Sequence, residues 1–453
     1  MRLDQNFPPR FALLVACVLL LSLGASAQDL LPKIDEYMNA AVKVDRFSGT
    51  ILVARDGKLI ASKGYGMADL ENDVPNTPET KFRLGSITKQ FTSAAIMLLQ
   101  ERGKLSVQDS VCKYVAPCPE AWQPITLHQV LSHTAGIPNF TSFPDYAKTM
   151  REPATTESVV ARFRDRPLDF KPGESWSYSN SGYILLGYII ERVSGQPYEQ
   201  FVRENIFAPL KMNDTGYDHT DAIIKHRARG YSRAGERLVN AAYMDMSIPH
   251  AAGALYSTVG DLYLWDQALY TDKLLKQTSL AAIYTPVKNE YGYGWGVSKM
   301  HNRTLYAHNG GINGFSTVIL RFPVERATVI VLSNYEPAPT GNIARDLAAI
   351  MFGEKYELPA ERVVAKVDPA IYDAYVGEYE LAPDFHIVVT RAGDRLLAQA
   401  TGQPQFELFP ASETKFFLKV VKADITFVKN EQGQVTHLIL DQGGRQQHAK
   451  KIK

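Results

Sequence analysis

The sequence predicts an α+β domain followed by a small all-β domain. Two strand-like runs, 49–55 and 58–64, lie near the start of the chain, and a second pair, 317–322 and 327–332, lies far downstream. Helical patterns dominate the region between the two pairs, and strands that enclose a helical middle are typical of an α+β fold. After a charged, proline-containing stretch at 356–369, short strand candidates recur, which favours a small barrel or sandwich.

The elements of the first domain follow from turn residues and apolar spacing. Asp56-Gly57 predicts a tight hairpin turn between the first two strands. Apolar residues recur at helical spacing from Phe91 to Leu99, and Gly103 follows where a helix-terminating glycine belongs. Similar patterns predict further helices over 126–132, 183–193, 198–206, 258–269 and 341–351.

The C-terminal region consists of short apolar runs, several of them separated by glycine-containing turns. The strand candidates are 376–379, 387–390, 396–400, 406–409, 415–418, 425–428 and 437–440. A small-molecule-binding cup is one interpretation of this domain, but we favour a stabilising or oligomerising appendage. The predicted organisation is therefore a leader at 1–27, a first domain at 28–355, a linker at 356–369 and a β-barrel domain at 370–453.

The first residues are typical of an export signal. Two arginines precede an apolar run at 11–23 that is too short to span a bilayer, and Ala25-Ser26-Ala27 fits a cleavage site. We expect an exported protein, periplasmic or secreted, whose mature chain begins at Gln28 and has no membrane span. A lipoprotein anchored at Cys17 is the second-ranked alternative, because the apolar run continues past that cysteine.

Charge and cysteine content exclude several classes of function. Removal of residues 1–27 leaves equal numbers of basic and acidic residues, so nothing indicates a nucleic-acid partner. Cys112 and Cys118 flank a turn-capable loop, and in an oxidising compartment a local disulfide is favoured over two free thiols. The histidines form no metal-binding pattern, so we expect neither a metal nor a cofactor.

Three short motifs indicate nucleophilic catalysis when they occur together in this order. Ser86-Ile87-Thr88-Lys89 comes first, Tyr178-Ser179-Asn180 second and His308-Asn309-Gly310 third. Ser86 is predicted to lie at the start of a buried helix, where its backbone N–H is free to point at a substrate oxygen. A serine needs a base to remove its proton, and Lys89 and Tyr178 are both candidates for that base.

These motifs, with Phe82–Lys89, Leu131–Ile137 and Gly292–Gly296, resemble the class C β-lactamase-like serine hydrolases. That group includes D-Ala-D-Ala carboxypeptidases, D-aminopeptidases, β-lactamases and esterases, and the similarity spans roughly residues 45–335. The resemblance implies an antiparallel sheet flanked by helices, with a helical subdomain and an active site in the cleft between them. The C-terminal region resembles the lipocalin-like module appended to some peptidases of the group.

The resemblance also implies roles for individual residues. Tyr178 would act on the Ser86 hydroxyl and on the leaving group, with Lys89 beside it. Asn180 would present its amide to the substrate, and the N–H groups of Ser86 and Gly311 would bind the oxyanion, with Gly310 allowing close approach.

The sequence departs from the family's lactamases at position 308. These enzymes usually carry a lysine there, and a histidine supplies positive charge only when it is protonated. We therefore expect His308 to read a substrate carboxylate weakly or in a pH-dependent way, with a structural hydrogen-bonding role as the alternative. His133 is interpreted as a residue that orients its loop.

The leading hypothesis is an exported serine hydrolase that forms an acyl-enzyme on D-amino-acid peptides, amides or esters. A carboxylesterase or a weak β-lactamase on the same scaffold is the alternative. A non-enzymatic ligand-binding ectodomain ranks last, because it has no chemical need for the complete set of motifs. The expected partners are a small-molecule or peptide substrate, and a homo-oligomer through the C-terminal domain is a further hypothesis.

Overall fold

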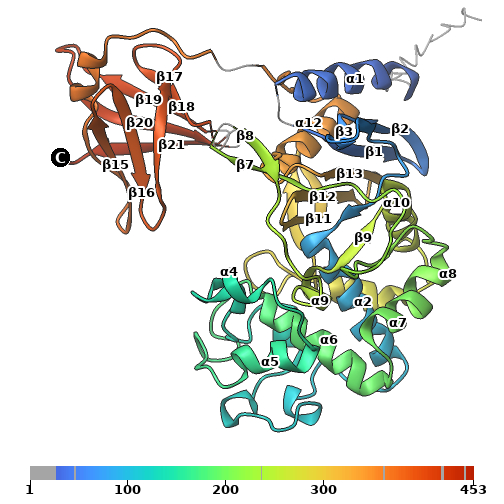
Figure 1. Ribbon diagram of the computed structural model, residues 1–453. Coiled ribbons are helices and arrows are strands. Elements are labelled where there is room, and N and C mark those ends of the chain that lie inside the picture. The colour runs from blue at the N-terminus through green and yellow to red at the C-terminus, as the bar shows by residue number, and fades with distance from the viewer. Residues whose placement is uncertain (1–26, 45–46, 236, 361–362, 420–422, 443–444) are drawn as a thin grey trace, which may run out of the picture.

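The computed structural model describes residues 27–44, 47–235, 237–360, 363–419, 423–442 and 445–453 (Figure 1). The predicted export signal and Cys17 lie outside these residues, apart from Ala27, where helix α1 begins. The chain forms an α+β domain with a six-stranded sheet and, after a linker, a closed barrel of eight strands. This confirms the predicted fold class.

The main sheet is antiparallel throughout and has the strand order β10-β11-β12-β13-β1-β2. Its strands are β1 (Gly49–Arg55), β2 (Lys58–Tyr65), β10 (Gly296–Met300), β11 (Arg303–Ile312), β12 (Phe315–Phe322) and β13 (Ala327–Ser333). The predicted turn joins β1 to β2, with Asp56 and Gly57 both at positive φ. β1 lies between β2 and β13, so the two strand pairs recognised far apart in the sequence form one sheet.

Alternating residues of the sheet are buried on both of its faces. Ile51 and Val53 pack with helices α1 (Ala27–Lys43) and α12 (Thr340–Phe352), which cover one face (Figure 1). Leu52 joins the larger core on the other face, where the sheet meets α2 (Thr88–Glu101) and α10 (Val259–Ala268). Successive strand residues point to opposite sides, so two-sided burial makes these strands continuously apolar.

The remaining helices of the first domain lie beyond this second face, with α4 to α6 at the end of the domain farthest from α1 (Figure 1). They are α3 (Leu127–Leu131), α4 (Tyr146–Thr149), α5 (Thr156–Arg164), α6 (Asn180–Ser194), α7 (Tyr198–Val202), α8 (Ala208–Leu210), α9 (His250–Gly253) and α11 (Gln277–Tyr284). The helix predicted over 198–206 continues to Leu210, with a π-helical turn at Arg203–Phe207 between α7 and α8. Small sheets are formed by β3 (Met67–Asp69) with β4 (Val74–Pro75), by β5 (Phe82–Arg83), β9 (Leu255–Ser257) and β6 (Gly216–Tyr217), and by β7 (Tyr231–Ala234) with β8 (Arg237–Asn240).

The barrel closes through its last strand. Its strands are β14 (Gly377–Ala382), β15 (Phe385–Ala392), β16 (Arg395–Ala400), β17 (Gln405–Pro410), β18 (Lys415–Phe417), β19 (Ala423–Lys429), β20 (Val435–Gln442) and β21 (Arg445–Lys451). β21 pairs with both β20 and β14, so the barrel has one strand more than the seven candidates identified in the sequence. In β21 only Ala449 belongs to the barrel core, so its sequence lacks the apolar alternation of a strand.

Aromatic side chains fill part of the barrel interior. Tyr375 stacks on Phe427 with ring centroids 4.3 Å apart, and its hydroxyl donates to the backbone carbonyl of Glu413 at 2.6 Å. Phe416 packs edge-on against both rings, beside a 3₁₀ turn at Pro369–Ala374.

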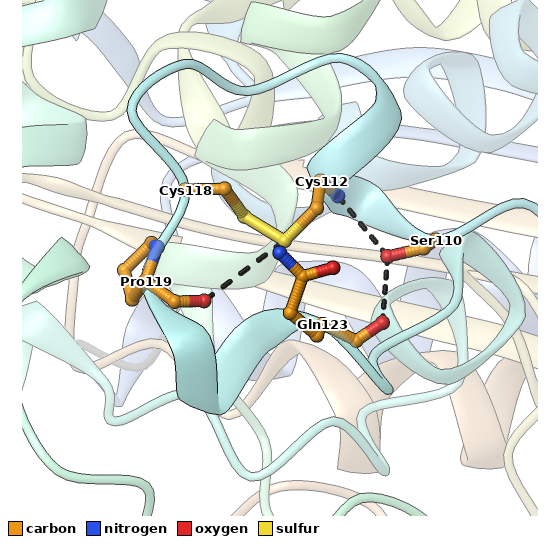
Figure 2. The surroundings of a disulfide bond; sticks show 5 residues. All are labelled: Ser110, Cys112, Cys118, Pro119 and Gln123. Carbon is orange, nitrogen blue, oxygen red and sulfur yellow. Dashed lines mark hydrogen bonds between the residues drawn. A yellow bond between two sulfur atoms is a disulfide. The ribbon is translucent and has the colours of Figure 1, made fainter.

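A disulfide links Cys112 to Cys118 in the loop after α2 (Figure 2). The Ser110 hydroxyl accepts from the Cys112 N–H at 3.2 Å and donates to the Gln123 carbonyl at 2.8 Å. These bonds and the disulfide connect three points of the loop. Among the described residues, no helix is long and apolar enough to cross a membrane.

A buried ion pair joins the sheet to α10. Arg321 Nε in β12 lies 3.0 Å from Asp266 Oδ1, and the two side chains are only 2% and 1% exposed. Burial raises the pKa of the Asp266 carboxyl to about 6, and the Arg321 guanidinium opposes that rise. The guanidinium also lies 3.9 Å from the centre of the Tyr270 ring. Loss of either partner would leave a charge in the interior without compensation.

We predict that Asp266→Ala destabilises the first domain by about 3–5 kcal/mol, because it leaves the buried Arg321 charge without its partner. Glu157→Ala is the matched control, since Glu157 pairs with Arg192 where both side chains are exposed, and it should cost less than about 1 kcal/mol. Urea unfolding followed by tryptophan fluorescence checks this, because all four tryptophans precede residue 300. Equal losses in the two variants would contradict the prediction.

Candidate active site

Ser86 lies in a 3₁₀ turn, Gly85–Ile87, that leads directly into α2. Gly85 has φ +54°, and a Cβ there would lie 3.0 Å from the backbone N of Gly311. The backbone before Ser86 therefore passes close to β11. Ser86 is partly exposed, and N–H groups in the first turn of a helix have no intrahelical partner.

The side-chain nitrogen of Lys89, one turn after Ser86, is enclosed by the protein. Lys89 Nζ lies 3.1 Å from Ser86 Oγ, 2.8 Å from Asn180 Oδ1 and 2.9 Å from the Ala252 carbonyl oxygen. Lys89 has no exposed surface, and burial lowers the pKa of its amine well below the ordinary value. All three hydrogen-bonding neighbours are uncharged groups, so the amine form is favoured over the ammonium form.

Asn180 begins α6 and is held in a fixed orientation. Its backbone N–H donates to Asn139 Oδ1 at 3.1 Å, and its Nδ2 donates to Thr141 Oγ1 at 3.2 Å. Because Nδ2 is directed at Thr141, Oδ1 faces Lys89 Nζ. The structure thus brings together the first two motifs of the sequence, which lie on different helices.

The Tyr178 ring lies beside the lysine, with Lys89 Nζ 4.9 Å from the ring centroid. Burial raises the pKa of the Tyr178 phenol, and the neighbouring Ser86 hydroxyl opposes that rise. Within the described part of the chain the phenol oxygen has no aligned hydrogen-bond partner. The phenol form is therefore favoured, and its proton is free for a substrate group.

His133 supports the loop that carries Tyr178, as the sequence predicted. Its Nδ1 accepts from the Ser179 N–H at 3.2 Å, and its ring centroid lies 4.4 Å from that of Tyr178. The carbonyl of His133 also accepts from the Ser177 N–H at 3.0 Å. Two neighbours of Tyr178 in the chain are thereby fixed by one residue.

The third motif lies in β11 where that strand runs past the end of its neighbour β10. The pairing of β10 with β11 begins at Gly296 opposite Ala307, so residues 308–312 extend beyond β10. A Cβ on Gly310 would lie 2.0 Å from the Leu84 carbonyl, so only glycine allows this approach. Gly311 is exposed, and a Cβ there would meet no atom within 4 Å. Its backbone borders open space next to Gly85.

His308 is buried, which favours a neutral imidazole over a carboxylate-reading cation. Its Nδ1–H donates to the Asn309 carbonyl at 2.6 Å, and Nε2 lies 2.9 Å from the Tyr291 hydroxyl. Burial lowers the pKa of the His308 imidazole to about 4, and any charge on the nearby Lys89 would act in the same direction. Since both ring nitrogens are engaged, the geometry favours the structural hydrogen-bonding role for His308, the alternative interpretation of the sequence.

Two contributors to the site have no signal in the sequence. The Ala252 carbonyl in α9 accepts from Lys89, and a backbone carbonyl is available at every position of a chain. Gly294, at φ +75°, packs against the backbone of α2 at Lys89, and a Cβ on Gly294 would lie 2.8 Å from the Lys89 carbonyl oxygen. Only its position in a glycine-rich stretch suggests a close contact.

A cavity of about 200 Å³ opens beside Ser86. It is bordered by Asn180, Gly311 and the α9 residues Ala252 and Gly253, so all three motif regions reach it. No group of three or more histidine, cysteine or carboxylate side chains suited to a metal ion occurs in the part of the chain that the structure describes. The arrangement is suited to attack by a serine hydroxyl that an uncharged amine activates.

The fold and this serine–lysine–tyrosine cluster define a hydrolase of the β-lactamase type. A family model described as Beta-lactamase matches residues 34–350, and a model of a domain of unknown function, DUF3471, matches residues 361–451. The chain belongs to the β-lactamase family and is a serine hydrolase.

Relatives extend over most of the chain. Penicillin-binding protein 4* of Bacillus subtilis (strain 168) is 31% identical over 430 residues, which cover 89% of this chain and 94% of that protein. The octameric penicillin-binding protein homologue from Pyrococcus abyssi is 27% identical, with a TM-score of 0.67 over 93% of this chain and 100% of its own. A D-stereospecific amidohydrolase from Streptomyces sp. is 26% identical, with a TM-score of 0.61 over 72% of this chain and 99% of its own.

We predict that His308 makes folding stability depend on pH between about 6.5 and 4. Its pKa is lower in the folded protein than the ordinary value of 6.5, so the unfolded chain binds the proton first as pH falls. Stability is fully present above about 6.5 and declines toward pH 4, by on the order of 3 kcal/mol. His308→Gln should flatten this decline in chemical unfolding, whereas His226→Gln, on an exposed side chain, should not. Parallel curves for all three proteins would show that folding does not shift the pKa of His308.

Proposed function

We propose that this protein is an exported serine hydrolase that forms an acyl-enzyme on Ser86 with D-amino-acid peptides, amides or esters. The observation that carries the proposal is the buried Lys89 amine. Its Nζ contacts the oxygens of Asn180 and Ala252, and its third hydrogen-bond neighbour is Ser86 Oγ. A merely structural lysine would gain nothing from burial beside a partly exposed serine hydroxyl, since burying its charge is costly. The same lysine is useful as a base near neutral pH.

Lys89 is the favoured proton acceptor. The Asn180 and Ala252 oxygens can only accept hydrogen bonds, so they use two N–H groups of the amine. In the neutral amine the remaining lone pair faces the Ser86 hydroxyl. The Ser86 proton moves to Lys89 Nζ as Oγ bonds to the substrate carbonyl carbon, and the charge develops on the carbonyl oxygen.

The resulting oxyanion lies between the backbone N–H groups of Ser86 and Gly311 in this proposal. The close approach of Gly85 to Gly311 supports it, because Ser86 and Gly311 both border the cavity. Collapse of the intermediate breaks the bond to the leaving group, which takes a proton from Tyr178 as Lys89 returns one to Tyr178. Water then hydrolyses the acyl-enzyme by the same route.

The substrate class is supported by two of the relatives. One is a D-stereospecific amidohydrolase and another a penicillin-binding protein homologue, and each shares the fold over most of its own length. A carboxylesterase on the same scaffold is the second candidate, favoured by His308 at the position where the family's lactamases usually carry a lysine. A weak β-lactamase is a further alternative. The intact cluster argues against a non-enzymatic ectodomain.

Export and domain organisation are part of the proposal. The Cys112–Cys118 disulfide supports an oxidising compartment, and the family matches at 34–350 and 361–451 support a boundary within the predicted linker. Determination of the mature N-terminus tests export, with Gln28 expected and a lipid-modified Cys17 as the contradicting result. Assembly through the barrel is a hypothesis supported by the octameric relative, and sedimentation analysis of the full chain tests it.

We predict that Ser86→Ala abolishes turnover, with a loss on the order of a thousandfold or more, because the nucleophile is gone. A serine-directed fluorophosphonate should add one adduct to the parent protein, mapped to Ser86, and none to the variant. Ser93→Ala, in the next turn but one of the same helix, is the matched control and should keep labelling. Labelling of Ser86→Ala at the parental rate would disprove the assignment.

We further predict that Tyr178→Phe and Lys89→Ala differ in their dependence on the leaving group. A p-nitrophenyl ester expels a leaving group that needs no proton, so Tyr178→Phe should keep its rate within about tenfold and lose about a hundredfold or more on the matched amide. Lys89→Ala should lose about a hundredfold or more on both. Rapid-mixing kinetics on the ester–amide pair measure this, and equal losses on both substrates in Tyr178→Phe would make Tyr178 the base.

A further inference from the structure

The cavity beside Ser86 is apolar on one side and polar but uncharged on the other. Its apolar wall is formed by Phe140, Tyr146, Met244, Pro249 and Ile312. Phe140 and Tyr146 meet edge to face with ring centroids 5.6 Å apart, and Tyr146 remains half-buried at the cavity.

The polar side chains that border the cavity, besides Ser86, are Thr141, Asn180 and Asn313. All three are neutral at any working pH. Asn180 and Thr141 bond to each other at 3.2 Å, and Asn313 Nδ2 donates to the Ala242 carbonyl at 3.0 Å. Among the described residues that border the cavity, none carries a charge that could pair with an ionised group of the substrate.

The two basic groups within the three motifs are both committed to the protein. Lys89 Nζ already has three hydrogen-bond neighbours beneath Ser86, and His308 uses both ring nitrogens within the fold. A substrate carboxylate bound here would lose its water without gaining a partner, which is strongly unfavourable. A substrate ammonium group would face the same cost.

We propose that the enzyme acts on substrates that are uncharged on both sides of the scissile bond. The acyl part is an N-acylated amino acid with an apolar side chain, which packs against the wall of Phe140, Tyr146 and Met244. The leaving group is an alcohol or a carboxamide-terminated amine without a free carboxylate. This inference rests on the proposed function, because it concerns the substrate of the same Ser86 site.

The size of the cavity agrees with this class. A volume of about 200 Å³ lies below the ~300–1,000 Å³ typical of sites for drug-sized ligands. It accommodates the apolar side chain, the scissile group and a small residue on the leaving-group side, while the N-acyl end of the substrate extends into solvent. An apolar substrate side chain therefore gains more binding free energy in this cavity than a charged one does.

The test uses two peptides that differ only in their C-terminal charge, N-acetyl-D-phenylalanyl-D-alanine amide and the corresponding free acid. The parent enzyme should cleave the amide with a kcat/KM at least about tenfold higher at pH 7.5 in low salt. Replacement of D-phenylalanine by D-glutamate in the amide should lower kcat/KM by a similar factor. Equal or faster cleavage of the free acid would overturn the inference.

A variant that adds a cation to the cavity sharpens the test. Asn313→Lys should narrow the amide-to-acid ratio by at least about threefold, whereas Asn213→Lys, which adds the same charge at an exposed position away from the cavity, should leave it unchanged. An equal change in both variants would indicate a general charge effect and overturn the assignment to the cavity.

Fluorophosphonate labelling of Ser86 distinguishes failure of the proposed function from failure of the substrate inference. An unlabelled protein that cleaves neither peptide would refute the proposed function and the inference together. A labelled protein that cleaves the acid as fast as the amide, or cleaves neither, would refute the inference alone.

Discussion

The structure depends on the burial of one lysine amine among uncharged groups. Lys89 Nζ is hidden from solvent and bounded by a serine hydroxyl, an asparagine carbonyl and a backbone carbonyl. Each comes from a different element, so α2, α6 and α9 must converge on one point. Because a buried cation needs compensation that these neighbours supply only in part, the surroundings hold the amine close to neutrality. The geometry that lowers the pKa of Lys89 is thus the same geometry that fixes the three elements.

Close contacts between backbones explain how the sheet reaches this point. Gly85 approaches Gly311, Gly310 approaches the Leu84 carbonyl, and Gly294 approaches the carbonyl of Lys89. Each contact excludes a Cβ, so side chains do not separate β11 from the start of α2. The nucleophile and the open end of β11 consequently share one cavity. The neutral character of that cavity follows from what packs around it, since His308 and Lys89 satisfy their hydrogen bonds within the protein.

Sequence reasoning recovered the elements whose signals are local. The hairpin at Asp56-Gly57 and the helix that ends before Gly103 were predicted because a turn and a terminating glycine act over a few residues. The three motifs were predicted as a group, and the structure brings them together, but the charge of His308 could not be inferred. That charge depends on burial and on Lys89, both set by tertiary packing. Strand β21 was missed because its polar sequence becomes a strand only by pairing on both sides.

The order of strands in the main sheet has a consequence for the timing of folding. β1 pairs with β2 as a local hairpin, yet its other edge pairs with β13, where Gly49 lies opposite Ser333. A chain that emerges from its N-terminus must therefore leave that edge unpaired until almost the whole first domain has been made. The same holds for the barrel, because one edge of its first strand, β14, pairs with its last strand, β21. Non-local closures of this kind slow folding and expose strand edges meanwhile.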